Sequence, residues 1–327
     1  MKIYDNILQA IGNTPMVRLN RVTKGVEADI LAKCEFVNPS GSLKDRIALR
    51  MIEEAEKAGK LREGGVVTES STGNTAIALS FVCAAKGYKS IMHMPKGWVT
   101  EDRLQILKAY GAEVIEVAVG EEIEKELEGK AVHGGVVEVM PRIKALEMET
   151  KNDNVWWARQ ALNPDNVNAH QDGTAQEIIE QTDGKIDVFI AAVGTGGTLS
   201  GVSKALKKVN PAVKIYAVEP EGQSLFKMGP EIRKYMEKYG VPGVEALIVE
   251  DMREKGIVDE VFLVNDEDAR AMGHRLCEEE GLFCGMSSGA NVHVALQVAK
   301  DLDKDKTIVT VLADNRYRYL AVEHFTT

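Results

Sequence analysis

A chain of 327 residues with 44% hydrophobic residues is long enough for two globular lobes with large buried cores. Its formal charge of −10 excludes a general binder of nucleic acid or anionic membranes, because contacts with phosphate need clustered Lys and Arg. The sequence shows no apolar run of bilayer-spanning length and no apolar core of a signal peptide near its start, so we expect a cytoplasmic protein.

The cysteines and histidines give no sign of a metal centre or a disulfide framework. The 4 cysteines contain no Cys-x-x-Cys pair, which favours reduced thiols, and the 6 histidines contain no His-Glu-x-x-His pattern. We therefore expect no metal cofactor.

Short apolar runs alternate with amphipathic segments along most of the chain. The apolar runs predict strands at residues 30–35, 66–69, 90–94, 113–117, 187–193, 214–219, 261–264 and 307–313. The amphipathic segments predict helices at residues 45–59, 75–87, 101–110, 176–182, 199–209, 266–280 and 290–302. This alternation is typical of parallel sheets covered by helices, so the predicted fold class is α/β with two sheets.

Two connections, residues 120–154 and 222–259, are weakly periodic, and we expect irregular structure in both. Long connections of this kind in a compact enzyme commonly form lids, subunit contacts or segments that line the site.

A polar turn at residues 38–46 reads Asn-Pro-Ser-Gly-Ser-Leu-Lys-Asp-Arg and places Lys44 where a helix is predicted to begin. The positive end of a helix dipole, together with burial, lowers the pKa of a lysine and releases the neutral amine that imine chemistry needs. Most lysines are only solvated, so the turn by itself leaves catalysis and a plain surface role both open.

A second turn, Gly-Thr-Gly-Gly-Thr at residues 194–198, follows a predicted strand and opens a helix. Its glycines let several backbone N–H groups converge on a phosphate, and Thr195 and Thr198 can add hydroxyl donors. A dinucleotide site is the competing interpretation, since Glu219 lies where a ribose-binding acid is expected. Leu199 stands where that fingerprint needs its third glycine, which favours a single phosphate.

Two more turns precede helices, Ser-Ser-Thr-Gly-Asn-Thr at residues 70–75 and Gly-Met-Ser-Ser-Gly-Ala at residues 285–290. Each alone is explained by ordinary helix capping. Four polar turns in one α/β chain favour a ligand site, because open sheets bind ligands at the carboxyl ends of their strands.

With these turns in place, the sequence closely resembles the cysteine synthase and cystathionine β-synthase family of fold-type II pyridoxal-phosphate enzymes. The likeness also includes Gly12-Asn13-Thr14-Pro15, Gln160 with Asn163-Pro164, and Val218-Glu219-Pro220. It implies a tryptophan synthase β-like fold with two open twisted sheets covered by helices. It further implies a larger cofactor-binding domain, residues 1–40 and 162–327, and a smaller mobile α/β domain, residues 41–161, with Lys44 at its edge.

The resemblance also implies a role for each turn. Lys44 would form the internal aldimine with pyridoxal phosphate, Asn74 would hydrogen-bond the ring oxygen, and Ser287 would meet the pyridine nitrogen. The cofactor phosphate would be held by Gly194, Thr195, Gly196, Gly197 and Thr198. The substrate carboxylate would be held by Ser71, Thr72, Thr75 and Gln160. A hydroxyl at the pyridine nitrogen, unlike a carboxylate, does not favour ring protonation, which suits loss of a β-substituent over transamination.

The implied reaction is β-replacement on a serine- or cysteine-type amino acid through an aminoacrylate, with Lys44 as general base and sulfide or a thiol as the second nucleophile. One alternative is release of hydrogen sulfide from cysteine, by β-elimination or by hydroxyl replacement that forms serine or lanthionine. Others are a serine or threonine ammonia-lyase and an idle relative that only binds or regulates. The resemblance also implies a homodimer, and we expect no haem-binding extension or regulatory domain.

Residues 241–248 depart from the family pattern, because Glu245 falls where the family has one glycine of a Gly-Ile-Gly-Ala-Gly-Phe run. A carboxylate beside the reacting carbon would act as a general base toward water or a thiol and favour sulfide release or a thioether product. The alternative is a solvated glutamate in a slipped alignment.

Overall fold

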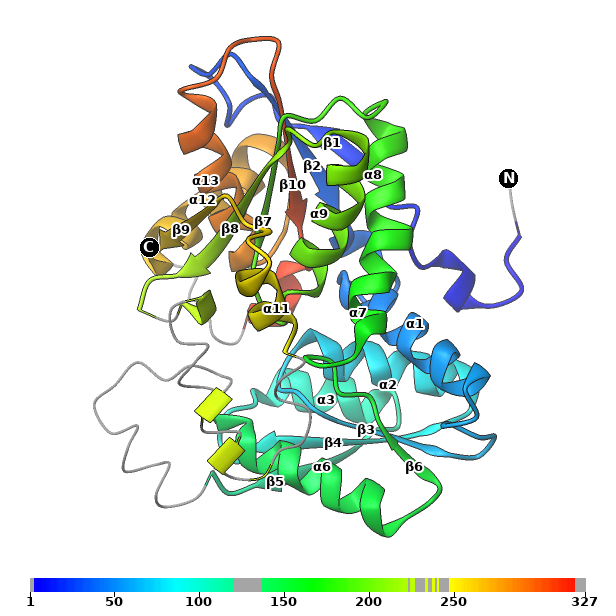
Figure 1. Ribbon diagram of the computed structural model, residues 1–327. Helices are drawn as coiled ribbons and strands as arrows, with labels where there is room; N and C mark the ends of the chain where they lie inside the picture. Colours follow the sequence, from blue (N-terminus) through cyan, green and yellow to red (C-terminus); the bar gives the residue numbers. More distant parts are fainter. Residues whose placement is uncertain are drawn as a thin grey trace.

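The computed structural model describes residues 3–119, 137–222, 224–226, 233–234, 237–238, 240 and 247–320. These residues form two open sheets, each covered by helices, with one sheet in each half of the molecule (Figure 1). The predicted α/β fold class is confirmed.

The larger sheet has 6 strands in the order β1-β2-β10-β7-β8-β9. Its strands are β1 (Met16–Arg18), β2 (Asp29–Cys34), β7 (Val188–Ala192), β8 (Lys214–Pro220), β9 (Glu260–Val264) and β10 (Thr307–Leu312). Only the pair of β1 and β2 is antiparallel among these strands. The central strands read as continuous apolar runs because helices bury both of their faces.

Successive residues of β7 pack on opposite faces of this sheet, as the period of two requires. Val188 and Ile190 belong to the core beneath α12 (Asp266–Glu280) and α13 (Met286–Ala299). Phe189 belongs to the core on the other face. That face is covered by α8 (Ala175–Gln181), α9 (Gly197–Val209) and α11 (Ile248–Glu254). Before α8 come α7 (Pro164–Ala169) and a π-helical turn, η3 (His170–Thr174).

The smaller sheet has 4 parallel strands in the order β5-β4-β3-β6. They are β3 (Val66–Ser70), β4 (Lys89–Pro95), β5 (Glu113–Val117) and β6 (Val155–Trp157). Three helices contribute to the core on one face, α1 (Lys44–Lys57), α2 (Asn74–Lys86) and α3 (Glu101–Ala109). Helix α6 (Val139–Lys151) covers the other face (Figure 1). The described residues also form short 3-10 turns at η1 (Ile7–Ala10), η2 (Glu35–Val37) and η5 (Arg316–Tyr319).

The expectation of irregular structure at residues 120–154 and 222–259 was wrong in part, because α6 and α11 lie inside these stretches. Val139 and Ala145 of α6 are buried together with Trp157 of β6. Tertiary packing therefore stabilises a helix whose own sequence pattern is weak.

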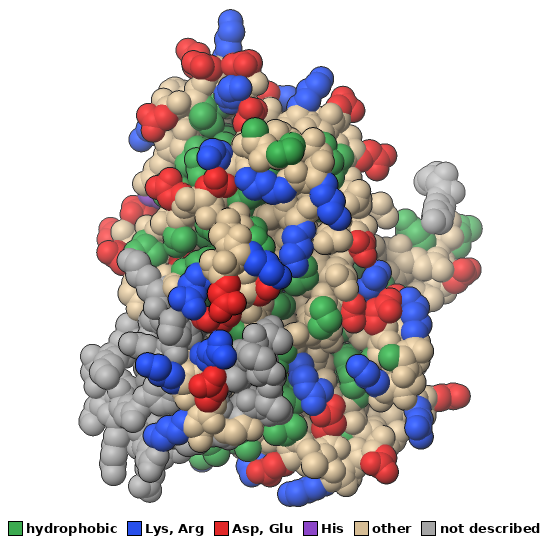
Figure 2. Space-filling model, viewed as in Figure 1, with side chains coloured by type: hydrophobic (Ala, Val, Ile, Leu, Met, Phe, Trp, Pro, Cys, Tyr) green, Lys and Arg blue, Asp and Glu red, His purple; other side chains and the backbone are tan. Residues whose placement is uncertain are grey.

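None of the helices in the described part of the chain is long and apolar enough to cross a bilayer. Within the same ranges, no group of three or more His, Cys, Asp and Glu residues is placed to hold a metal ion. Figure 2 shows Lys and Arg interspersed with Asp and Glu over one face of the molecule.

Candidate active site

The turn that carries Lys44 is attached to the carboxyl end of β10. The backbone N–H of Leu43 donates to the carbonyl of Ala313 at 2.9 Å, and that of Asn315 donates to the carbonyl of Gly41 at 3.0 Å. Gly41 has a φ of +89°, which a glycine adopts without strain. Lys44 is then the first residue of α1, so the helix begins where the sequence predicted.

The turn that carries Ser287 is attached to the same strand end from the other side. The backbone N–H of Gly285 donates to the carbonyl of Asp314 at 3.0 Å. The backbone N–H of Ala313 donates to the Ser288 hydroxyl at 3.0 Å. Lys44 and Ser287 thus flank one strand end, although their segments lie far apart in the sequence.

Burial lowers the pKa of the partly buried Lys44 amine to about 8, and the charge of Asp314 partly opposes this shift. A lysine with this pKa has a far larger neutral fraction near pH 7 than a solvated lysine. The amine is therefore suited to nucleophilic and general-base chemistry.

Asn74 opens α2, and its side-chain amide is held from both ends. Its Nδ2 donates to Asp314 Oδ2 at 2.7 Å, and its Oδ1 accepts from the Arg318 guanidinium. Arg318 also donates to the carbonyl of Ser40, and the Tyr319 hydroxyl donates to Asp314 Oδ2 at 2.5 Å. One orientation of the amide is thereby selected.

The sequence interpretation missed Asp314 and Arg318, because it assigned no role to the segment after the last strand. One signal could have found Asp314, since it lies just beyond the carboxyl end of the buried strand β10, where polar site residues are found in open α/β sheets. Nothing local in the sequence indicates the contact of Arg318.

The glycine turn at residues 194–198 presents an uncapped helix start. Gly196 has a φ of +88° and is the N-cap of α9, where no side chain caps the helix and no acidic residue occupies the first turn. Gly197 must lack a Cβ, which would overlap the Asn166 side chain. Backbone N–H groups and the positive end of the helix dipole are therefore available to an anion.

The two threonines of this turn each contact a side chain of the preceding helical segment, Asn166 or His170. The Thr195 hydroxyl accepts from Asn166 Nδ2 at 2.9 Å, which leaves its proton free to donate. The Thr198 hydroxyl lies 3.1 Å from His170 Nε2, and burial lowers the pKa of His170 well below its usual value. Sequence reasoning missed both Asn166 and His170, which set the shape of the turn.

The turn at residues 70–75 meets Gln160 at the carboxyl end of β3. The Thr75 hydroxyl donates to Gln160 Oε1 at 2.5 Å, and the Ser71 hydroxyl accepts from the N–H of Gly73 at 3.3 Å. The N–H of Thr72 donates to the carboxylate of Glu138, the residue before α6. Ser71, Thr72, Thr75 and Gln160 are thus brought together as a single polar group.

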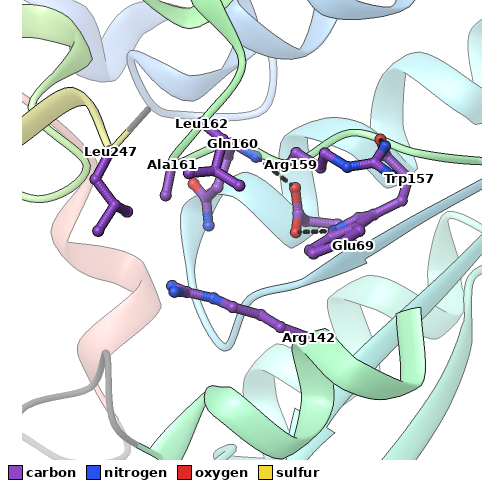
Figure 3. A pocket seen from close by; sticks show the side chains of 8 residues that line it. All are labelled: Glu69, Arg142, Trp157, Arg159, Gln160, Ala161, Leu162 and Leu247. Carbon is purple, nitrogen blue, oxygen red and sulfur yellow. Dashed lines mark hydrogen bonds between the residues drawn. The ribbon is translucent and has the colours of Figure 1, made fainter. Parts of the chain in front are cut away.

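Glu69 lies beneath this group and accepts three N–H donors. The donors are Ser70 N at 2.7 Å, Trp157 Nε1 at 2.9 Å and Gln160 N at 2.8 Å. Figure 3 shows the Trp157 and Gln160 bonds as dashed lines, with Arg142 extending from α6 toward Gln160. Glu69 was not singled out from the sequence, where it is the last residue of the predicted strand.

Ser287 lines a pocket of about 210 Å³ together with Val193 and Glu219. The Glu219 carboxylate accepts from the N–H groups of Leu225 at 2.9 Å and Phe226 at 3.2 Å. These bonds explain Glu219 as an anchor for the chain after β8, which removes the argument for a ribose-binding acid. Glu245 lies outside the described residues.

The arrangement fits a phosphorylated aldehyde cofactor. A reactive amine, an oriented amide and a helix-start hydroxyl lie at one sheet edge, and an uncapped glycine turn lies at the end of β7 in the same sheet. The amide and the hydroxyl suit a ring that accepts hydrogen bonds, for example at a ring oxygen. The glycine turn suits a phosphate, and the Lys44 amine suits an imine carbon.

Comparisons with known proteins agree with this interpretation. Residues 7–314 match the family described as "Pyridoxal-phosphate dependent enzyme". The chain is 42% identical to a cysteine synthase of Staphylococcus aureus over 98% of this chain and 96% of the relative. It is 39% identical to mouse cystathionine β-synthase over 98% of this chain and 55% of the relative. A crystal structure of a hydrogen sulfide-producing enzyme from Fusobacterium nucleatum is similar, with a TM-score of 0.82, 32% identity and coverage of 98% of this chain and 99% of that one.

Proposed function

Because this chain belongs to the family of pyridoxal-phosphate-dependent enzymes, we propose that it catalyses β-replacement on a serine- or cysteine-type amino acid. In this reaction a group on the β-carbon leaves, and sulfide or a thiol takes its place. The observation that carries the proposal is the meeting of the Lys44, Asn74 and Ser287 turns around the end of β10.

The four turns would hold the cofactor as the family resemblance implies. Lys44 would bind it covalently, Asn74 and Ser287 would contact its ring, and residues 194–198 would hold its phosphate. Bound pyridoxal phosphate stabilises negative charge at the α-carbon of an amino acid. Lys44 Nζ, with its pKa lowered to about 8 by burial, would take the proton from that carbon as general base.

The polar group of Ser71, Thr72, Thr75 and Gln160 would bind the substrate carboxylate. Its N–H and hydroxyl donors lie at the start of α2, where the helix dipole favours an anion. Closure of this loop over the carboxylate would exclude water until the nucleophile arrives. A smaller mobile domain of residues 41–161 is supported by the four-stranded sheet, whose strands all lie within residues 66–157.

A substrate panel tests this function. The purified enzyme would be given O-acetylserine, O-phosphoserine, serine and cysteine in turn, with and without sulfide or a thiol, and the products identified by mass. We expect a sulfur-containing amino acid from at least one of these substrates only when the nucleophile is present. Ammonia and a keto acid formed equally with and without sulfide would contradict β-replacement and indicate an ammonia-lyase.

Sulfide release from cysteine is the second candidate, favoured by the likeness to a hydrogen sulfide-producing enzyme. We propose that Glu245 acts as the base toward water or a thiol in that case. The test compares cysteine-dependent sulfide release in wild type and Glu245→Gln, with Glu254→Gln as a control at the end of α11. Equal rates in all three proteins would refute the role of Glu245.

We further propose a cytoplasmic homodimer: the homodimer rests on the family resemblance alone, and the location rests on the sequence pattern described above. Light scattering on the purified protein measures the assembly, and cell fractionation measures the location. A monomeric mass or a membrane-associated fraction would contradict the respective statement.

A further inference from the structure

Asp314 is the residue on which the segments of the site converge. It follows β10, is 1% exposed, and forms an isolated antiparallel bridge with Ser42 of the Lys44 turn. Its carboxylate lies directly against Gly285, where a Cβ would overlap Asp314 Oδ1 and crowd the Tyr319 ring. Only a glycine at position 285 leaves room for the carboxylate in this place.

The two carboxylate oxygens of Asp314 differ in their partners. Oδ2 accepts from Asn74 Nδ2 at 2.7 Å and from the Tyr319 hydroxyl at 2.5 Å. Oδ1 is buried and has no hydrogen-bond partner among the described residues. A buried acceptor without a donor is costly, so a structural role as a simple anchor does not account for both oxygens.

The charge of Asp314 acts on the Lys44 amine, and the backbone bridge between Asp314 and Ser42 places Asp314 beside the turn that carries Lys44. His170 of η3 is near enough to Lys44 for its charge to act on the imidazole, and burial keeps the pKa of His170 well below the usual value, so it is neutral. The Cys284 thiol near Asp314 has a pKa raised to about 12 by burial and is also neutral. Arg318 is held by Asn74 and Ser40, and it lies near both Asp314 and Asp45.

We propose that Asp314 is a positioning residue of the active centre, whose carboxylate orients the Asn74 amide and supplies the negative charge that faces the Lys44 amine. The proposal deepens the proposed function and rests on it, because Lys44 and Asn74 matter for catalysis only if they serve the cofactor. It assigns a role to the segment after β10, which the sequence interpretation left without one.

The first experiment measures the titration of Lys44 in the cofactor-free chain. Short pulses of acetic anhydride at a series of pH values, followed by mass spectrometry, give the fraction of Lys44 acylated, with Lys60 as an internal reference. In Asp314→Asn we expect the midpoint to fall by about one pH unit, since an opposite charge nearby favours the protonated amine. Tyr319→Phe removes a hydrogen-bond donor to Asp314 Oδ2 but keeps the charge of Asp314, so the midpoint of Lys44 should stay at the wild-type value.

An unchanged midpoint in Asp314→Asn, or an equal fall in Tyr319→Phe, would overturn the counter-charge role. Thermal melting checks that each variant is folded. Should the asparagine variant not fold, Asp314→Ser gives the same comparison, because the smaller side chain fits against Gly285. This measurement involves no substrate, so it stands even if the proposed β-replacement fails.

The second experiment tests the effect on Asn74. In the cofactor-loaded enzyme, Asn74→Ala and Asp314→Asn should shift the visible absorption band, and the double variant should add little to Asn74→Ala alone. Residues that act through one another are non-additive in this way. Fully additive shifts would show that Asp314 does not act through Asn74.

Discussion

Two cations in the first turn of α1, the buried Arg46 and the partly buried Lys44, have opposite environments. The Arg46 guanidinium donates to Glu35 at 2.7 Å and to Glu177 at 2.7 Å, and these carboxylates outweigh burial and raise its pKa. For the Lys44 amine, the charge of Asp314 only partly offsets the effect of burial, so the pKa of Lys44 falls to about 8. A buried cation that is fully compensated is structural, whereas an undercompensated one is kept reactive.

The first test of this comparison removes the reactive cation. Lys44→Ala should lower turnover by about 10³-fold or more, because both the attachment point and the general base are lost. The imine absorbance band of the loaded protein should also disappear. Lys57→Ala, at the exposed end of the same helix, serves as the control. Full turnover with an intact band in Lys44→Ala would make the assignment wrong.

The second test removes the compensated cation. Arg46→Met should lower the free energy of unfolding in urea by about 3–5 kcal/mol, because Glu35 and Glu177 lose their partner inside the protein. Arg50→Met is the matched control, since the more exposed Arg50 pairs with Glu54 at 3.3 Å and should cost less than about 1 kcal/mol. Similar losses of unfolding free energy in Arg46→Met and Arg50→Met would contradict a structural role for the buried Arg46 cation.

The third test uses pH to weaken the ion pair between Arg46 and Glu177. Burial opposes ionisation of Glu177, but the hydrogen bond and charge of Arg46 lower its pKa from 4.5 to about 2. Its stabilising effect is therefore complete above about pH 4.5 and is lost as the pH falls through 2, about 3 kcal/mol in all. Unfolding free energies across that range should fall more steeply in wild type than in Glu177→Gln. The exposed control Glu147→Gln should give a curve parallel to that of wild type. A parallel curve for Glu177→Gln would contradict the stabilising effect of ionised Glu177.

The smallest effect on activity is expected at Glu69, a buried carboxylate that accepts three N–H donors and lies beneath the candidate active site. Glu69→Gln puts an amide where three N–H donors point, so the backbone of Gln160 should move. We expect KM for the amino acid to rise about 10-fold with little change in kcat, as for lost ground-state binding. Glu149→Gln disturbs Trp157 and Arg159 without touching Gln160 and should leave KM unchanged. An equal rise of KM in both variants would indicate a general loss of packing around Trp157 and contradict a specific role of Glu69.

The sequence by itself determined the local elements of this protein. Apolar runs predicted eight of the described strands, and the turn before Lys44 predicted the start of α1, but the three-residue strands β1 and β6 were missed. The glycine turn before α9 was also found, because φ angles and helix caps depend on neighbouring residues. Each of these features is a property of a few consecutive residues, so one sequence suffices to predict it.

Only the tertiary structure decided which of these elements meet. β2 lies beside β10, and Asn74 is paired with Asp314 across 240 residues of chain. Arg46 finds Glu177 across 131 residues, and α6 forms because Trp157 covers its buried face. Such contacts depend on the strand order and on which faces remain to be buried, and no local period of the sequence carries that information.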